Sequence, residues 1–229
     1  MQARIADIFL SVQGEGIYVG QPQIFIRFGG CNLNCDFCDT PSPKGRPYGV
    51  LDIVDSVDSL NSSSAANTIS ITGGEPLLYT DFLKLILPQF KKKNFRIYLE
   101  TNGTLPGNLA KVLDFIDVIA MDMKLPSAQK KERSFWATHR DFLNRSRKKD
   151  VFVKVVVTGK TTQGEIKKVA AIIDDIDSGI PLVLQPVTPA NRMRKKVSLN
   201  AMFEFQKLAK TILKDVRVIP QIHRILGAK

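Results

Sequence analysis

All three cysteines of this 229-residue chain, Cys31, Cys35 and Cys38, fall within one eight-residue segment. Three thiolates spaced C-x3-C-x2-C suit a soft metal ion or an iron–sulfur cluster. A structural zinc site normally needs a fourth cysteine or histidine, and only the sequence-remote His139 and His223 could supply one. A [4Fe–4S] cluster held by three cysteines keeps one iron open, which a small molecule can chelate through amino and carboxylate groups. The odd cysteine count excludes a full disulfide framework.

The elements that must position these cysteines alternate between strand-like and helix-like apolar patterns. The expected strands cover residues 23–28, 68–72, 95–99, 117–121, 151–158, 182–184 and 216–219. Apolar stripes at helical spacing predict helices over 51–60, 82–90, 166–173 and 202–212, with weaker signals over 107–115 and 127–146. Residues 41–47 read as a loop. This alternation predicts an α/β fold with a parallel sheet, open or barrel-like, and a single domain over residues 1–229.

Polar or glycine-rich residues follow six of the seven expected strands. Turn preferences explain the glycines, because glycine, asparagine, aspartate and proline are favoured where a strand ends. They do not explain why charged and amide side chains converge there: Glu75, Glu100, Asp122, Lys124 and Gln185. Parallel α/β folds carry their active sites at the carboxyl ends of the strands, so we expect the site at this edge.

The composition, with 44% hydrophobic and 24% charged residues, is that of a globular protein and excludes disorder as the main state. No apolar run approaches the roughly 18 residues of a membrane helix, and the N-terminus lacks the pattern of a signal peptide. We therefore expect a cytoplasmic protein with no membrane partner.

Much of the net charge of +11 comes from residues 124–149, which contain nine lysines and arginines but only two acidic residues. A basic stretch can bind phosphates or RNA. A solvated helix face is the preferred interpretation, because no RNA-binding motif with interleaved aromatic residues accompanies the charge. A zinc-binding RNA-interaction protein remains an alternative.

The cysteine spacing resembles that of the radical S-adenosylmethionine (SAM) superfamily. Gly73-Gly74-Glu75-Pro76 is similar to the superfamily's GGE segment, which lies against the methionine end of SAM. The resemblance implies a partial (β/α)6 barrel with parallel strands, a [4Fe–4S] cluster and SAM as cofactor.

Within this superfamily the chain resembles the 7-carboxy-7-deazaguanine synthase family from about Asp7 to His223. The matching segments are residues 9–16, Gly20, Pro22, 25–31, 38–40, 72–76, 100–103, 184–186 and 216–223. The resemblance implies a radical ring contraction of 6-carboxy-5,6,7,8-tetrahydropterin to 7-carboxy-7-deazaguanine with loss of ammonia, in queuosine or other deazapurine biosynthesis. It also implies Mg²⁺, a flavodoxin- or ferredoxin-type reductant, a homodimer and no direct nucleic-acid partner.

The same resemblance assigns roles to residues of this chain. Cluster and metal ligands are Cys31, Cys35 and Cys38 for [4Fe–4S] and Thr40 for Mg²⁺. SAM-binding positions are Phe37, Gly74, Asp122 and Lys124. Substrate-binding positions are Val12, Gln13, Gly14, Glu15, Arg27, Thr72 and Gln185. The chemistry agrees, since a guanidinium suits a carboxylate, and an amide with a carboxylate can pair with the guanidine-like edge of a pterin.

Two departures and one enzyme alternative accompany this assignment. The chain has Asp122-Met123-Lys124 where many relatives carry Ser-Pro-Lys, and its segment between Thr40 and Leu51 is short. A glycyl-radical activating enzyme would share the fold and the cluster but would need a groove for a peptide. The 7-carboxy-7-deazaguanine synthase instead needs a closed polar pocket containing Arg27.

Overall fold

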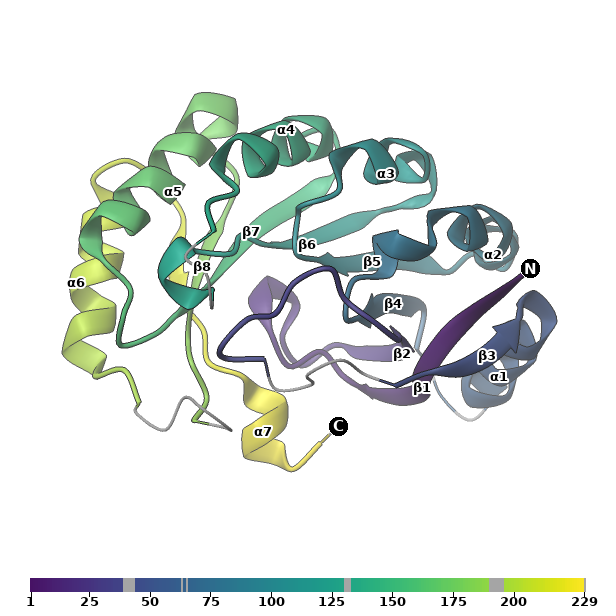
Figure 1. Cartoon of the computed structure of the whole chain (residues 1–229). Coiled ribbons are helices and arrows are strands. Elements are labelled where there is room, and N and C mark those ends of the chain that lie inside the picture. Colours follow the sequence, from purple (N-terminus) through teal and green to yellow (C-terminus); the bar gives the residue numbers. More distant parts are fainter. Residues whose placement is uncertain (39–43, 63, 65, 130–132, 190–195, 229) are drawn as a thin grey trace.

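One sheet of nine strands runs through the part of the chain that the computed structural model describes, residues 1–38, 44–62, 64, 66–129, 133–189 and 196–228 (Figure 1). Its strands are β1 (Gln2–Val12), β2 (Pro22–Phe28), β3 (Arg46–Gly49), β4 (Thr68–Gly73), β5 (Arg96–Thr101), β6 (Val118–Asp122), β7 (Asp150–Val157), β8 (Leu182–Pro186) and β9 (Val216–Val218). Their order across the sheet is β3-β1-β2-β4-β5-β6-β7-β8-β9. β1 is antiparallel to both neighbours, and the other pairs are parallel.

The seven expected strands are confirmed as β2 and β4 to β9, the parallel part of the sheet. The sequence analysis does not predict β1 and β3. Residues 41–43 of the loop expected over residues 41–47 lie outside the described residues. The expectation is wrong at its end, because Arg46 and Pro47 lie in β3 and pair with Ile5 and Arg4 of β1. An edge strand tolerates proline because one of its sides needs no hydrogen bonds.

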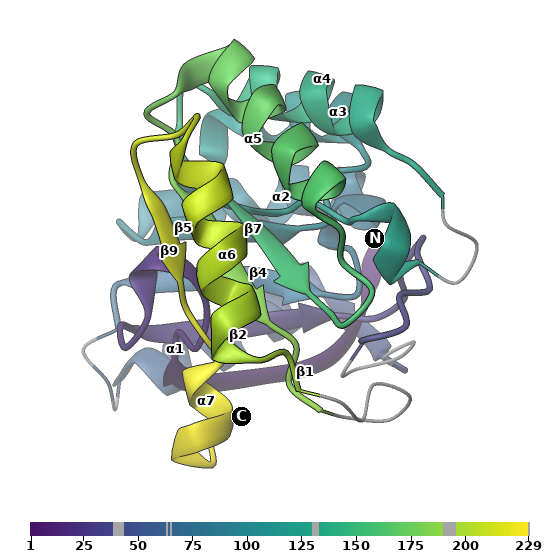
Figure 2. The same ribbon diagram turned by 90° about the vertical axis from the view of Figure 1, so that its left-hand side faces the viewer.

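The four helices expected from apolar stripes are confirmed. They are α1 (Val50–Ser62), α2 (Thr80–Lys92), α5 (Gln163–Asp177) and α6 (Leu199–Lys210). Together with two shorter helices, α3 (Pro106–Ala110) and α4 (Trp136–Ser146), they cover the outer, convex face of the sheet (Figures 1 and 2). The apolar side of each helix packs into the main core, which is the usual source of stability for helices of this length, although Leu51, the first residue of the stripe expected over residues 51–60, is exposed.

The two weaker helical expectations are only partly right. Residues 107–115 divide into α3 and the short 3-10 helix η3 (Leu113–Phe115). Over residues 127–146 the helix begins only at Trp136, and the 3-10 helix η4 (Pro126–Ala128) precedes it. Gln129 is extended and forms a β-bridge with Cys35, so residues 127–129 do not begin the expected helix, and residues 130–132 lie outside the described residues.

The strands present opposite faces to two different environments, because successive side chains of a strand alternate. On β7, Val153 and Val155 pack into the main core beneath the helices. Phe152 faces inward, where it joins Tyr98 in a smaller apolar cluster. Tyr18, from the 3-10 helix η1 (Gly16–Tyr18), packs edge-on against Tyr98 with ring centroids 5.8 Å apart. This small cluster forms an apolar floor on the inner face.

The sheet does not close into a barrel, since β3 and β9 remain its two edges. η1 contacts β7 and β8 inside the curve of the sheet. The short helix α7 (Ile222–Leu226) lies at the opening, and its Ile222 N–H donates to the carbonyl of Gly14 at 2.9 Å (Figure 1). The fold is thus the expected α/β partial barrel. Within the described residues, no helix is long and apolar enough to span a membrane.

Candidate active site

Polar side chains gather on the inner face of the sheet, near the carboxyl ends of the parallel strands. Strand register brings them together: Arg27 lies opposite Thr72, and Asp122 lies opposite Lys154. Side chains two positions apart on a strand point to the same face. Glu100 and Lys154 therefore point inward like Tyr98 and Phe152 of the apolar floor, and their charged groups lie next to it. From β2 to β8 the inner face carries Arg27, Thr72, Glu100, Asp122, Lys154 and Gln185.

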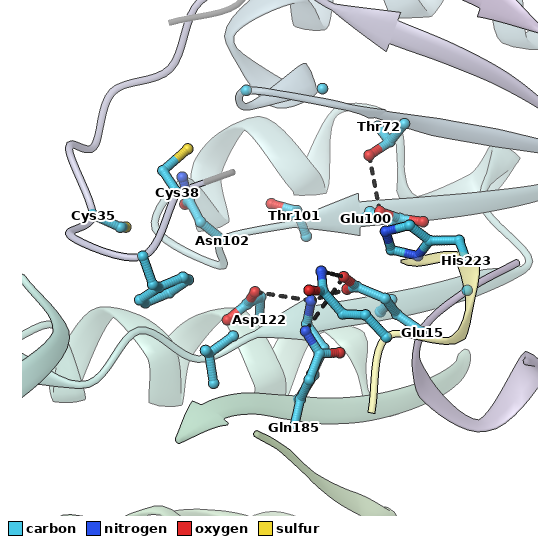
Figure 3. A pocket seen from close by; sticks show the side chains of 18 of the residues that line it. Glu15, Cys35, Cys38, Thr72, Glu100, Thr101, Asn102, Asp122, Gln185 and His223 are labelled. Atoms are coloured by element: carbon cyan, nitrogen blue, oxygen red, sulfur yellow. Dashed lines mark hydrogen bonds and ion pairs between the residues drawn. The ribbon is translucent and has the colours of Figure 1, made fainter. Parts of the chain in front are cut away.

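These side chains line a cavity of about 240 Å³ at the open end of the sheet (Figure 3). In this view Cys35 and Cys38 lie at one end, Glu100 and His223 lie at the other, and Asp122 lies between them. The cavity contains every residue to which the family resemblance assigns a role, except Thr40: Val12, Gln13, Gly14, Glu15, Arg27, Cys31, Cys35, Phe37, Cys38, Thr72, Gly74, Asp122, Lys124 and Gln185. Thr40 lies outside the described residues.

The three cysteines border the cavity in an arrangement that suits a cluster. The Sγ of Cys31 accepts a hydrogen bond from the N–H of Leu33 at 3.4 Å, and the Sγ of Cys35 accepts one from Nε2 of Gln129 at 3.3 Å. Among the described residues, no three Cys, His, Asp or Glu side chains converge closely enough to hold one metal ion. A cluster does not need this convergence, because each thiolate binds a different iron. The donor set therefore fits a [4Fe–4S] cluster better than a single zinc ion.

Glu75, which follows Gly73 at the end of β4 and then Gly74, is fully buried and holds two strand ends together. Its Oε1 accepts hydrogen bonds from the N–H of Leu77 at 3.1 Å and from the hydroxyl of Thr101 at 2.9 Å. Its Oε2 accepts one from the N–H of Asn102 at 2.8 Å. Burial raises the pKa of Glu75 to about 7, even though these donors favour the carboxylate. Glu75 thus shapes the loop beside the cysteines.

An acid–base pair occupies the cysteine side of the cavity. Nζ of Lys124 lies 2.8 Å from Oδ2 of Asp122 and 4.8 Å from the ring centroid of Phe37. Burial alone would raise the pKa of Asp122, but Lys124 and Lys154 outweigh it and hold the pKa below its usual value. Within the described residues, Oδ1 of Asp122 is buried without a hydrogen-bond partner. This oxygen is therefore an acceptor available to a bound ligand.

A second carboxylate, Glu15, organises the opposite side of the cavity. It accepts hydrogen bonds from Nζ of Lys154, from Nε2 of Gln185 at 3.3 Å and from Nε2 of Gln221 (Figure 3). Burial raises the pKa of Glu15, but the Lys154 ammonium more than offsets this, so the pKa lies below its usual value. Because Nε2 of Gln185 is held by Glu15, its Oε1, which has no partner among the described residues, is left as an oriented acceptor.

Gln13 borders the cavity, but its side chain is engaged by the protein itself. Nε2 donates to Glu100 at 2.9 Å and to Gln23 at 3.2 Å, while Oε1 accepts from the N–H of Glu15 at 3.0 Å. Only 2% of the residue is exposed. The expected pairing of this side-chain amide with a pterin edge stays a prediction; in this structure the amide supports the backbone that presents Glu15.

Arg27 differs from Lys124 and Lys154, because its guanidinium has no carboxylate partner among the described residues. Its Cζ lies 5.2 Å from the ring centroid of Phe9, which holds it by a cation–π contact. The neighbouring Thr72 donates its hydroxyl to Oε2 of Glu100 at 2.9 Å. The arrangement leaves the guanidinium fork available for an anionic ligand.

Several residues that build the site have no role predicted from the sequence. Lys154 could have been noticed as the lone charged residue of the expected strand over residues 151–158. Asn102 donates from Nδ2 to Asn32 at 2.9 Å and lies 3.9 Å from Sγ of Cys31. Gln221 and His223 belong to a segment that carries the resemblance, but nothing in their spacing indicates that they contact Glu15 or pack against residues 13–15.

The histidines and the basic stretch do not favour the zinc and RNA interpretation. Nε2 of His139 lies 3.1 Å from the carbonyl oxygen of Asn102, and burial lowers the pKa of this histidine to about 4. Among the described residues, neither histidine joins the cysteines in a group able to hold a metal ion. On α4, Arg140 and Arg145 form surface ion pairs with aspartates, as expected of a solvated helix face.

Comparison with known proteins agrees with this geometry. The family model described as Radical SAM superfamily matches residues 25–170. A 7-carboxy-7-deazaguanine synthase of Geobacter sulfurreducens is 39% identical over 98% of this chain and 97% of its own length. That of Methanothermobacter thermautotrophicus is 35% identical over 100% and 99%. The chain belongs to the 7-carboxy-7-deazaguanine synthase family. It is thereby a radical SAM enzyme.

Solved structures support the fold of this 7-carboxy-7-deazaguanine synthase family member. QueE from Escherichia coli superposes with a TM-score of 0.65 at 20% identity, covering 95% of this chain and 94% of that one. TYW1, in a structure with a lysine-pyruvate adduct bound, superposes with a TM-score of 0.59 at 15% identity, covering 83% and 74%. Membership of the radical SAM superfamily implies a [4Fe–4S] cluster and SAM, which the cysteine segment and its cavity fit.

Proposed function

We propose that the chain is a carbon–nitrogen lyase that converts 6-carboxy-5,6,7,8-tetrahydropterin to 7-carboxy-7-deazaguanine with release of ammonia. The observation that carries the proposal is the Arg27 guanidinium, which opens into the cysteine-bordered cavity without a carboxylate of its own among the described residues. A substrate carboxylate would complete this pairing by a charge-assisted, bidentate contact. The full-length similarity to 7-carboxy-7-deazaguanine synthases supports the same reaction.

On the cysteine side, we assign the cluster to Cys31, Cys35 and Cys38. Bound beside these cysteines, the reduced cluster and SAM would supply the radical chemistry that removes a hydrogen atom from the substrate. Asp122 offers its unpartnered Oδ1 to donors of SAM, and Lys124 offers an ammonium held in place by Asp122. Phe37 and Gly74 contribute surface next to the cysteines.

On the other side of the cavity, we assign Arg27 to the substrate carboxylate and Gln185 to a donor of the pterin edge. The oxygen that Gln185 presents accepts hydrogen bonds, so it selects a ring N–H or amino group over a carbonyl. Residues 12–15 and Thr72 line the same side of the cavity. The small apolar floor beneath these groups limits the access of water to the inner face.

Several features of the proposal rest on the family resemblance alone. They are Mg²⁺ bound through Thr40, a flavodoxin- or ferredoxin-type reductant, a homodimer, and a place in queuosine biosynthesis leading to modified tRNA. The single domain over residues 1–229 rests instead on the alternation of strand and helix patterns along the sequence. Magnesium prefers oxygen ligands and keeps several waters or substrate oxygens, so one threonine hydroxyl is a reasonable protein contribution.

The proposed function is tested by anaerobic reconstitution with iron and sulfide, followed by reaction with SAM, dithionite and the carboxytetrahydropterin. We expect the visible absorption of an iron–sulfur cluster and a deazaguanine product with one ammonia released per turnover. Absence of product from a cluster-loaded enzyme that still cleaves SAM would refute the proposed substrate. A hydrogen atom taken from a protein glycine would instead identify an activating enzyme.

A further inference from the structure

Lys154 stands out because it is a charged side chain within an apolar strand. On β7 its neighbours Val153 and Val155 point into the helix-covered core, so strand alternation directs Lys154 to the inner face. Its side chain is only 13% exposed. Burying an ammonium is costly unless ion pairs and hydrogen bonds compensate for the lost water, so its partners must account for its presence.

The partners are two carboxylates on different segments. Nζ of Lys154 contacts Oε2 of Glu15 and lies 3.1 Å from Oδ2 of Asp122. Glu15 follows β1 by a short turn, whereas Asp122 ends β6. Burial lowers the pKa of Lys154, but these two carboxylates outweigh burial and raise it above its usual value. The lysine is therefore a permanent cation between two anions.

Each carboxylate also contacts side chains that border one half of the cavity. Glu15 holds Gln185 and Gln221, which border the half assigned to the substrate. Asp122 holds Lys124 at 2.8 Å, on the cysteine side assigned to SAM. The ammonium of Lys154 is therefore the point at which the hydrogen-bonded groups of both halves meet.

We propose that Lys154 is a positioning residue that holds Glu15 on the substrate side and Asp122 on the SAM side in their working geometry. This inference rests on the proposed function for the names of the two ligands. Lys154 acts through the two carboxylates and needs no contact with either ligand. Its distinguishing consequence is that one substitution disturbs the binding of both ligands, whereas a residue serving one half would disturb only one.

The primary test is Lys154→Met, which keeps the chain length and apolar stem of the side chain but removes the ammonium. The matched control is Lys93→Met, which breaks an exposed ion pair with Asp58 outside the cavity. In the reconstituted enzyme, we expect Lys154→Met to raise KM for both SAM and the pterin and to lower kcat/KM roughly 10- to 100-fold. Lys93→Met should leave both KM values at the wild-type level.

A second readout uses the protein without cluster or ligands. In Lys154→Met, backbone amides of residues 13–18 and of residues 122–125 should exchange hydrogen faster than in the wild type, since both segments lose their shared anchor. Amides in the centre of α2, a helix on the outer face of the sheet, serve as the internal reference and should be unchanged. This readout remains valid if the wild-type enzyme makes no deazaguanine, a result that would refute the proposed function alone.

The outcomes separate a positioning role from a purely structural one. A rise in KM for only one ligand, or for neither, overturns the proposal, as does unchanged exchange in either segment. If Lys154→Met does not fold, Lys154→Gln decides by the same criteria, because it removes the charge but keeps a polar side chain that can donate one hydrogen bond. Wild-type KM values for both ligands in Lys154→Gln would then overturn the proposal.

Discussion

Gly74 and Gly30 lie in direct backbone contact beside the cysteine segment. A Cβ added to Gly74 would lie 1.8 Å from the carbonyl oxygen of Gly30 and 3.0 Å from Cβ of Cys31. The N–H of the next residue, Glu75, donates to that same carbonyl at 3.0 Å. The glycine therefore allows the loop after β4 to approach the loop that begins the cysteine segment.

Gly74→Ala should consequently destabilise the protein and impair cluster assembly. A backbone carbonyl cannot rotate away as a flexible side chain can, so we expect a loss of about 1–3 kcal/mol in the free energy of unfolding. Urea unfolding and the iron content after reconstitution measure the two effects. Gly107→Ala is the matched control, since a Cβ there meets nothing within 4 Å. Equal stability of the two variants would contradict the close-contact argument.

Arg27→Ala should abolish most turnover without loss of the cluster. Removing a charge-assisted contact to a substrate carboxylate costs about 1.5–3 kcal/mol, so kcat/KM should fall roughly 10- to 100-fold or more. Arg46→Ala is the control, because Arg46 also stacks on an aromatic ring, that of Tyr48 at 5.1 Å, but does not line the cavity. Loss of iron from Arg27→Ala would mean that Arg27 has a structural role instead.

His139 should make the stability of the protein depend on pH on the acidic side. Burial lowers its pKa from 6.5 to about 4, so between these values the unfolded chain binds more protons than the folded one. The stabilising contribution is complete above about pH 6.5 and is lost progressively towards pH 4, up to about 3 kcal/mol. Comparing urea unfolding of the wild type and His139→Gln from pH 4 to 8 isolates this slope. A difference independent of pH would exclude a neutral buried histidine.

Glu75 should have the opposite effect on the pH dependence of stability, over a similar pH range. Burial raises its pKa from 4.5 to about 7, so between these values the folded state holds the extra proton and stability falls as pH rises. Glu75→Gln removes this slope but places an amide where the carboxylate accepts from the N–H of Asn102. We therefore expect the variant to be least stable relative to wild type near pH 4.5, with the gap narrowing towards pH 7. A gap that widens with pH would show that Glu75 stays ionised.

The division between sequence and tertiary structure is clearest on β7 and β1. Successive side chains of a strand point to opposite faces of the sheet. Once residues 151–158 are taken as a strand, Lys154 must therefore share a face with Phe152. It does not reveal that Glu15, 139 residues away, supplies the partner carboxylate. The side chain of Gln13 illustrates the same point, since only its contacts with Gln23 and Glu100 show that the amide is engaged.

The sequence by itself determined the parallel α/β order and the family, and it predicted the cluster ligands and many of the polar residues that line the cavity. These features depend on the spacing of nearby residues and on the residues that follow each strand, and both can be recognised in the sequence. Only the tertiary structure decided which charged groups neutralise one another, how closely Gly74 approaches Gly30, and that residues 221–223 reach back to residues 14 and 15. Such contacts depend on strand register and on packing between distant segments, and neither can be predicted from the local sequence pattern.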